Sequence, residues 1–252
     1  MKDFTNTGII ILAAGRGTRF NLDNKNKVIL PLNGKAMILY SVDLARKVGL
    51  DPILVVVGFA KHSVIDLLKD SVLYAEQKEQ LGTAHAVSIA TQKISQRVEN
   101  VVVVNGDDSA FYDEKLIKKL LETHFKTKAA VTFLTIKINN PKGLGRVIRD
   151  KTGAIIRIVE EKDATEKEKE VKEINPGSYV FRMSFLREYI QKVEKSPVTG
   201  EFYLTRLIDL ALQDKKRVET QKAGFYPWRG VNTMSEFEEA NKVFKNKKHE
   251  NI

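Results

Sequence analysis

Residues 8–20 read GIIILAAGRGTRF, an apolar run that ends in a turn with two glycines and two arginines. A continuous apolar run is typical of a parallel strand that is covered on both faces. A glycine-rich turn directly after the first strand of such a sheet places backbone N–H groups at the edge where α/β proteins bind anions. The stretch therefore predicts an α/β fold with a phosphate site after its first strand.

The first half of the chain alternates between candidate strands and candidate helices. Short β-branched runs predict strands at 8–12, 53–57, 72–75, 101–104 and 130–136. Apolar residues at helical spacing predict helices at 36–48, 61–68, 83–94 and 113–125. This alternation predicts a doubly wound, Rossmann-like α/β sheet that is mixed and mostly parallel.

The second half has a more varied pattern. Residues 146–149 and 155–159 predict a β-hairpin. The charged stretch 160–173 predicts an exposed loop or a short helix. Ser235, with Glu238 three residues later, is a candidate capping box at the start of the last helix.

Composition limits the class of protein. The 252 residues, 42% of them hydrophobic, are enough for a single globular domain. Cysteine is absent, which excludes disulfides and thiolate metal sites. The net charge of +10 is spread along the chain as lysine without interleaved aromatic residues, so we expect no nucleic-acid partner. No apolar stretch approaches the roughly 20 residues of a membrane span, so we expect a cytoplasmic protein without a membrane partner.

The turn after the first strand differs from the standard nucleotide motifs. Gly15-Arg-Gly-Thr-Arg-Phe has the first two glycines of a dinucleotide fingerprint, but Phe20 occupies the position of the third. The Gly-Lys-Ser/Thr of a P-loop is also missing. The segment offers instead two cations, Arg19 and Lys27, that can face a triphosphate.

The sequence from Leu12 to Met37 resembles the signature of sugar-1-phosphate nucleotidyltransferases, in Leu12-Ala-Ala-Gly-Arg-Gly-Thr-Arg19 and Lys27-Val-Ile-Leu-Pro-Leu-Asn-Gly-Lys-Ala-Met37. Further motifs are similar, in order and spacing, to the uridylyltransferase half of bacterial N-acetylglucosamine-1-phosphate uridylyltransferases. They are Gln77 with Glu79-Gln-Leu-Gly-Thr-Ala-His-Ala86, Gly143-Leu-Gly-Arg146, Ile158-Val-Glu-Glu-Lys-Asp-Ala164, Glu173-Ile-Asn175, Phe202-Tyr-Leu-Thr205 and Gly230-Val-Asn232. The resemblance spans nearly the whole chain.

The resemblance implies one nucleotidyltransferase domain of Rossmann-like fold over residues 1–252. Within it, residues 1–140 would form the nucleotide-binding half, 141–232 the sugar-binding half, and 233–252 a C-terminal helix with a basic tail. The bacterial bifunctional enzymes continue into a hexapeptide-repeat acetyltransferase domain. We expect no such domain in this chain.

The implied reaction is attack of a sugar 1-phosphate oxygen on the α-phosphorus of a nucleoside triphosphate, with loss of pyrophosphate. The nucleophile is already ionised, so positioning and charge neutralisation matter more than a base. By resemblance, Arg19 would hold the pyrophosphate, Lys27 would stabilise charge at the α-phosphorus, and Asp107 and Asn232 would bind Mg²⁺. One extra residue lies between Arg19 and Lys27 relative to the family pattern, so Lys25 is an alternative to Lys27.

Two positions depart from the family pattern beside the metal. Asn105 stands where the family usually has an aromatic residue, and Asp108-Ser-Ala replaces an apolar-Pro-Leu sequence. Asp108 is therefore a second carboxylate that could replace Asp107 as a ligand or join it.

The resemblance also implies which residues bind the substrates. The nucleotide would contact Leu12, Ala13, Ala14, Gly15, Gly17, Thr18, Gln77, Gly82, Thr83, Asn105 and Gly106. The sugar would contact Gly145, Glu160, Asn175 and Asn232. We interpret His85 as a packing residue on the helix that follows Thr83, and Trp228 as part of the core.

The favoured substrates are UTP and N-acetylglucosamine 1-phosphate, with Mg²⁺ as the cofactor. Within the same enzyme class, the alternatives are glucose 1-phosphate or another hexose phosphate as acceptor, or dTTP as donor. The alternative from another class is a catalytically silent regulatory or binding subunit. The retained set of Arg19, Lys27, Asp107 and Asn232 favours the enzyme, because a silent subunit does not need both opposed cations and metal ligands.

Overall fold

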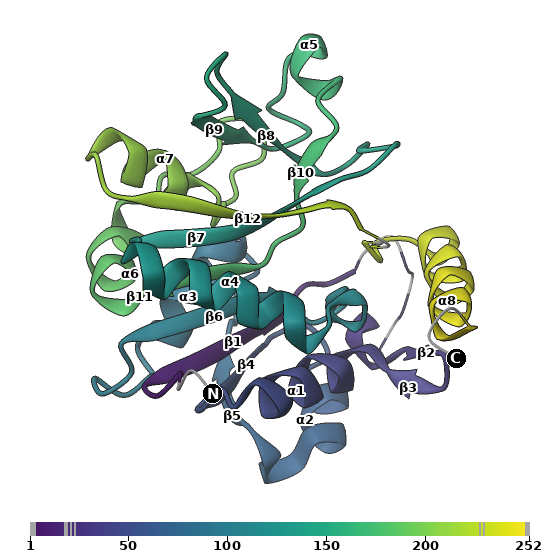
Figure 1. Ribbon diagram of the computed structural model, residues 1–252. Helices are drawn as coiled ribbons and strands as arrows, with labels where there is room; N and C mark the ends of the chain where they lie inside the picture. The colour runs from purple at the N-terminus through teal and green to yellow at the C-terminus, as the bar shows by residue number, and fades with distance from the viewer. Residues whose placement is uncertain are drawn as a thin grey trace.

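The computed structural model describes residues 4–17, 20, 22, 24–226, 228 and 230–249, and Figure 1 shows their arrangement. Ten of the described strands form one mixed sheet in the order β5-β4-β1-β6-β11-β7-β10-β8-β9, with β12 paired to β7. These strands are β1 (Thr7–Ala13), β4 (Ile53–Val57), β5 (Leu73–Glu76), β6 (Asn100–Asn105), β7 (Val131–Lys137), β8 (Gly145–Arg149), β9 (Ile155–Val159), β10 (Glu173–Asn175), β11 (Tyr179–Arg182) and β12 (Val218–Phe225). The predicted α/β class is confirmed.

The part of the sheet from β5 to β6 is parallel and matches the predicted strands. In β1, Ile10 lies opposite Leu54 of β4 and Val103 of β6. Successive side chains alternate, so Ile9 and Ile11 pack on one face of the sheet while Ile10 packs on the other. Burial on both faces is why β1 is a continuous apolar run. The parallel pairing brings the carboxyl ends of β1 and β6 to the same edge.

Helices cover both faces of the sheet (Figure 1). On one face lie α1 (Met37–Val48), α2 (Lys61–Leu68) and α4 (Glu114–Thr127), and on the other α3 (Thr83–Thr91), α6 (Met183–Tyr189) and α7 (Arg206–Gln213). The four helices predicted in the first half are all present, with shifts of a few residues at their ends. In the described residues, no helix is both long enough and apolar enough to cross a bilayer.

The second half of the chain adds antiparallel strands. The predicted hairpin is formed by β8 and β9, and β10 pairs antiparallel with both β7 and β8. Between β6 and β7 lies β11, antiparallel to both. Strands β10, β11 and β12 were not predicted from the sequence. β10 has one apolar residue in three and β12 is largely polar, whereas β11 is a short apolar run of the kind that predicts a strand. The charged stretch 160–173 contains the short helix α5 (Glu166–Lys169), one of the two forms predicted for it.

The last helix, α8 (Met234–His249), lies beside the hairpin of β2 (Pro31–Leu32) and β3 (Lys35–Ala36), as Figure 1 shows. The predicted cap at Ser235 is wrong. The helix begins at Met234, and the hydroxyl of Thr233 accepts a hydrogen bond from the Glu236 N–H at 3.1 Å. Thr233 and Glu236 have the same spacing as the predicted capping pair, which explains the shift.

Candidate active site

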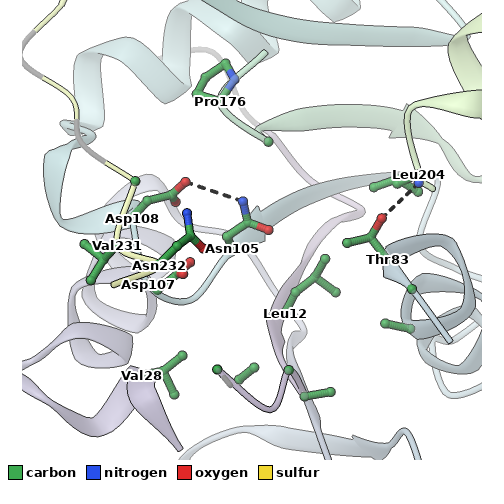
Figure 2. Close-up of a pocket in the computed structure, with 18 of the residues that line it drawn as sticks. Leu12, Val28, Thr83, Asn105, Asp107, Asp108, Pro176, Leu204, Val231 and Asn232 are labelled. Atoms are coloured by element: carbon green, nitrogen blue, oxygen red, sulfur yellow. Dashed lines mark hydrogen bonds between the residues drawn. The ribbon is translucent and has the colours of Figure 1, made fainter. Parts of the chain in front are cut away.

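A cavity of about 570 Å³ opens at the carboxyl edge of β1 and β6. Figure 2 shows part of its lining, with Leu12 in β1, Thr83 at the start of α3, and Asp107 and Asp108 beyond the end of β6. Open α/β sheets bind ligands outside the carboxyl ends of their parallel strands. The cavity is therefore the candidate active site.

One side of the cavity, which we call the β1 wall, is the backbone of residues 12–17. Asn26 holds this wall, because its Nδ2 donates to the carbonyl oxygens of Ala13 at 2.9 Å and Gly15 at 3.3 Å. The same nitrogen donates to the Phe59 carbonyl at 3.0 Å. The buried Asn26 thus fixes the turn against two other segments. The sequence analysis did not assign this role to Asn26. The indication that the sequence offered was the position of Asn26 directly before Lys27.

Gln77 is 3% exposed and lies beside the β1 wall. Its Nε2 donates to the Gly82 carbonyl at 3.0 Å and lies 3.1 Å from Nδ1 of His85. An amide nitrogen donates hydrogen bonds, so Nδ1 of His85 is the acceptor in this contact. His85 therefore orients a predicted base-reading residue in addition to packing, which the sequence did not indicate.

The start of α3 is joined to a loop of the second half by hydrogen bonds from backbone N–H groups of that loop. The Leu204 N–H donates to Thr83 Oγ1 at 2.9 Å, and the Phe202 N–H donates to the Leu81 carbonyl at 2.8 Å. Gly82 lies in this join with φ of 112°, and a Cβ there would come within 2.5 Å of the Phe202 oxygen. Both the backbone angle and the close approach require glycine.

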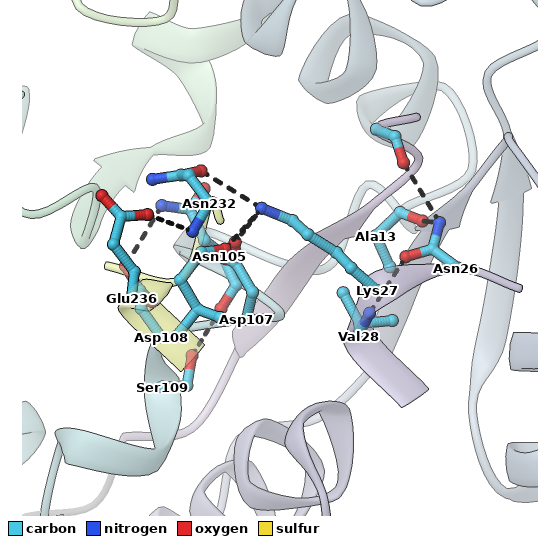
Figure 3. A network of polar contacts seen from close by, with 12 residues as sticks. Ala13, Asn26, Lys27, Val28, Asn105, Asp107, Asp108, Ser109, Asn232 and Glu236 are labelled. Carbon is cyan, nitrogen blue, oxygen red and sulfur yellow. Dashed lines mark hydrogen bonds and ion pairs between the residues drawn. The ribbon is translucent and has the colours of Figure 1, made fainter. Parts of the chain in front are cut away.

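The predicted catalytic lysine and the two predicted metal ligands meet inside the cavity (Figure 3). The ammonium group of Lys27 forms an ion pair with the Asp107 carboxylate. It also donates to the Val231 carbonyl at 2.9 Å and to Asn232 Oδ1 at 3.2 Å. The Asn232 N–H donates to the Glu236 carboxylate at 2.7 Å, which fixes Asn232 ahead of α8. Residues about 200 positions apart in the chain thus converge on one point.

The donor set at this point fits a magnesium ion. The Asp107 carboxylate and the Asn232 amide oxygen already face one positive charge, the ammonium of Lys27. Both are hard oxygen donors of the kind that Mg²⁺ prefers, and Mg²⁺ commonly takes its other ligands from water and phosphate. Asp107 and Asn232 are therefore the residues that would hold it.

Asp108 is buried in the cavity wall next to Asp107 and is 3% exposed. Burial, and secondly the charge of Asp107, raise the pKa of the Asp108 carboxyl well above its usual range. Nδ2 of Asn105 donates to its Oδ2 at 3.4 Å. In the part of the chain that the structure describes, Oδ1 of Asp108 has no hydrogen-bond partner.

The opposite side of the cavity, which we call the β8–β10 wall, consists of Gly145, Glu160 and Asn175. Gly145 and Asn175 face each other in the ladder between β8 and β10, and Glu160 directly follows β9. The three strands are antiparallel neighbours, so the start of β8 and the ends of β9 and β10 meet at one edge. A Cβ at Gly145 would lie 3.4 Å from Glu160 Oε2, so the backbone and the carboxylate are close.

Side chains from distant parts of the chain support this wall. The Thr205 hydroxyl donates to Glu160 Oε1 at 2.9 Å. Desolvation is the main reason that the pKa of Glu160 is raised, and the Thr205 hydrogen bond acts against it. Nδ2 of Asn175 contacts the hydroxyl of the buried Tyr179 at 2.5 Å. Sequence reasoning missed both supports; for Thr205 the available signal was its place in a motif shared with the resembled family.

The structure places the predicted site residues in three ways. Most of them line this one cavity: Leu12, Ala13, Ala14, Gly15, Gly17, Lys27, Gln77, Gly82, Thr83, Asn105, Asp107, Gly145, Glu160, Asn175 and Asn232. Gly106 is not among the lining residues, although its N–H donates to the carbonyl of the lining residue Leu12 at 2.9 Å. Thr18 and Arg19 lie outside the described residues.

The fold and the site define a class: an α/β protein with a glycine-rich turn after its first strand and oxygen donors at the same sheet edge. The chain belongs to the nucleotidyl transferase family, whose profile matches residues 9–247.

Curated relatives are similar over most of this chain. The bifunctional protein GlmU of Staphylococcus saprophyticus is 37% identical over 242 residues, which cover 96% of this chain and 53% of that protein. GlmU of Exiguobacterium sibiricum is 40% identical over 224 residues, which cover 88% of this chain and 49% of that protein. The chain thus spans about half the length of these relatives.

A solved structure shares the fold. A Bacillus anthracis protein assigned as a glucose-1-phosphate thymidylyltransferase superposes with a TM-score of 0.80 over 95% of both chains, at 21% sequence identity. At this level of identity the similarity supports the nucleotidyltransferase fold alone.

Proposed function

We propose that the protein transfers a uridylyl group from UTP to N-acetylglucosamine 1-phosphate, giving UDP-N-acetylglucosamine and pyrophosphate with Mg²⁺ as the cofactor. In this proposal, the β1 wall and Gln77 bind the nucleotide, and the β8–β10 wall binds the sugar. The corresponding division of the chain is a nucleotide-binding half at 1–140 and a sugar-binding half at 141–232. The choice of substrates rests on the motifs that resemble those of bacterial N-acetylglucosamine-1-phosphate uridylyltransferases, and the similarity to the GlmU proteins covers about half of their length.

One observation carries the proposal. Lys27, Asp107 and Asn232 meet in the cavity that both walls line, and we call this point the junction, because in this proposal the nucleotide and the sugar phosphate come together there. A cation and two hard oxygen donors at such a junction suit a reaction that gathers negative charge around one phosphorus.

The chemistry needs no proton transfer. An oxygen of the sugar phosphate forms a bond to the α-phosphorus of UTP, and the bond from that phosphorus to the β-phosphate oxygen breaks. Lys27 neutralises charge at the α-phosphorus, and Arg19, by resemblance, holds the departing pyrophosphate. Asp107 and Asn232 would hold Mg²⁺, which would supply further charge neutralisation for the phosphate oxygens.

The second wall suits a sugar. The Glu160 carboxyl can accept from sugar hydroxyls, the Gly145 N–H can donate, and the Asn175 amide can pair with a substituent. A site built from such groups discriminates strongly when one of them is left unpaired. The competing proposals within the class are glucose 1-phosphate as acceptor and dTTP as donor.

A pyrophosphate-release assay with purified protein tests the proposal. Each of UTP, dTTP, CTP, ATP and GTP is paired with N-acetylglucosamine 1-phosphate, glucose 1-phosphate and galactose 1-phosphate. We expect UTP with N-acetylglucosamine 1-phosphate to give the highest kcat/KM, by ~10-fold or more over glucose 1-phosphate. Equal use of the two sugars would overturn the acceptor assignment, and no release from any pair would favour the silent subunit.

The same assay tests the metal. EDTA should abolish activity, Mg²⁺ should restore it, and Asp107→Asn should be far more damaging than Asp108→Asn. Full activity without divalent ions would reject the mechanism, and equal damage from both substitutions would mean that the two carboxylates bind the metal together.

A further inference from the structure

Asp108 is a buried carboxyl group in the wall of the cavity with unused hydrogen-bonding capacity. It is 3% exposed, and its Oδ1 has no hydrogen-bond partner in the described residues. Its Oδ2 accepts a long hydrogen bond from Asn105 Nδ2, at 3.4 Å. Buried polar atoms are nearly always paired, and leaving one unpaired is unfavourable. A ligand group is one way to complete this pairing.

The partner of Asp108 packs against the turn that carries Asn175. Nδ2 of Asn105 would lie 2.4 Å from a Cβ at Gly177, so only the absence of that atom leaves room for the amide. The Gly177 N–H donates to Asn175 Oδ1 at 3.1 Å. The Tyr112 hydroxyl donates to the Pro176 carbonyl at 3.2 Å. Figure 2 shows Asp108 and Asn105 directed toward each other in the view that includes Pro176.

The two neighbouring carboxylates therefore have different surroundings. Asp107 pairs with Lys27, close to Asn232. Asp108 pairs with Asn105, and among the described residues Lys27 forms no ion pair with it. The first carboxylate lies at the junction of the two walls, and the second lies next to the proposed sugar-binding turn.

We propose that Asp108 is a specificity-determining residue that accepts a hydrogen bond from a hydroxyl or amide N–H of the sugar, on the side that faces Asn175. A carboxyl group has an oxygen that can accept in either protonation state. The matching ligand is a sugar 1-phosphate with a donor group at that side of its ring. This inference rests on the proposed function, because it names a contact within the same acceptor site.

The test measures how Asp108 couples to single groups of the sugar. We compare the parent enzyme with Asp108→Val for glucose 1-phosphate, its 2-, 3-, 4- and 6-deoxy analogues, and N-acetylglucosamine 1-phosphate. We expect the kcat/KM of the parent for one deoxy analogue to be at least ~10-fold lower than its kcat/KM for glucose 1-phosphate. In Asp108→Val, the two kcat/KM values should become similar. The sugar KM of the variant should rise ~10-fold, whereas its UTP KM and its half-saturating Mg²⁺ concentration should stay within about twofold.

Two further variants keep the test decisive if Asp108→Val folds poorly. Asp108→Asn keeps the shape and should alter the sugar KM while the melting temperature stays close to that of the parent. Ser109→Ala is the matched control, because Ser109 is buried beside Asp108 and bonds to the Asn105 carbonyl at 2.6 Å without lining the cavity. It should leave the selectivity among the sugars unchanged.

The outcomes separate this inference from the proposed function. An equal loss of kcat/KM for every sugar would make Asp108 a structural residue and overturn the inference, as would an unchanged preference among the deoxy analogues. A large rise in the half-saturating Mg²⁺ concentration would make it a metal ligand instead. If the parent enzyme uses no sugar 1-phosphate at all, the proposed function fails and this inference fails with it.

Discussion

The β1 wall and the β8–β10 wall face the same cavity but differ in how they present their groups. The β1 wall is a continuous stretch of backbone, residues 12–17, that leaves a parallel strand and is fixed by one buried amide, Asn26. The β8–β10 wall combines Gly145 of β8, Asn175 of β10 and Glu160, which directly follows β9. The side chains of Glu160 and Asn175 depend on supports from Thr205 and Tyr179. Backbone recognition can be encoded in one short motif, whereas side-chain recognition needs several distant segments at once.

The difference also shows in what each wall tolerates. Substitutions within a backbone wall act mainly through chain geometry, since its N–H and C=O groups survive a change of side chain. Substitutions in a side-chain wall remove the recognising group itself and can leave its buried partner unpaired. Substitutions at the junction, in the supporting fold and in the β8–β10 wall should therefore differ in the size and kind of their effects.

The largest effect is expected at the junction. Lys27→Ala should lower kcat by at least ~100-fold, about 3 kcal/mol, because a preorganised cation facing developing charge is lost. Lys25→Ala is the control, since Lys25 is exposed and should have a mild effect. Steady-state kinetics with circular dichroism to confirm folding measure both. A reversal of the two effects would move the catalytic role to Lys25 and would show that the alignment through the extra residue is wrong.

The next effect concerns the join between the two halves. Gly82→Ala would force a side chain into a backbone conformation open almost only to glycine, and against the Phe202 backbone. We expect a loss of about 2–3 kcal/mol of folding free energy, or a fall in melting temperature of ~5 °C or more. Gly15→Ala is the control, because nothing lies within 4 Å of a Cβ at Gly15. Equal melting temperatures for the two variants would contradict the close approach.

A third effect tests the connection between the parallel and antiparallel parts of the sheet. His124 of α4 is 2% exposed, with Nδ1 3.0 Å from Thr132 Oγ1 in β7 and Nε2 3.2 Å from Asn100 Oδ1 in β6. Desolvation, and secondly the charge of Arg182, lower the pKa of His124 from 6.5 to about 4. The folded state therefore binds the proton less tightly than the unfolded state.

The sign of the pH effect follows from that difference. Above pH 6.5 both states are neutral and stability is at its full value, and it falls as the pH drops from 6.5 toward 4. Between pH 7 and pH 5 the loss should be about 2 kcal/mol from this residue, measured by denaturant unfolding. His124→Gln should remove most of this dependence, while His62→Gln, at an exposed site, should keep it. An unchanged pH dependence in His124→Gln would show that His124 is not the responsible group.

The smallest effect is expected at the β8–β10 wall. Glu160→Ala and Asn175→Ala should each narrow the preference for N-acetylglucosamine 1-phosphate over glucose 1-phosphate by several-fold, about 1 kcal/mol. Thr205→Val should act in the same direction as Glu160→Ala but more weakly, because it removes the 2.9 Å hydrogen bond that Glu160 accepts and leaves the Glu160 carboxyl in place. Variants that lower kcat/KM for both sugars equally would assign these side chains to the fold instead of to selectivity.

The sequence by itself determined the parallel part of the fold and the residues of the junction. Buried parallel strands must be continuous apolar runs, so β1, β4 and β6 are visible as such, and the glycine-rich turn after β1 marks the ligand edge. The type of each charged group at the junction was also visible, because each stands in a short motif of its own. Strands β10, β11 and β12 were not predicted. A three-residue strand and a largely polar strand lack the periodicity that predicts them, and β11 is an apolar run of only four residues.

Only the tertiary structure decided which groups support one another. The contacts of Thr205 with Glu160, of His85 with Gln77 and of Lys27 with Asn232 join residues through side-chain geometry. The local sequence does not specify such pairings, because they depend on the register and order of the strands that carry the partners. The same reason explains the shift of the last helix cap from Ser235 to Thr233: two similar capping pairs overlap in the sequence, and the structure uses the one whose Glu236 also holds Asn232 beside Lys27.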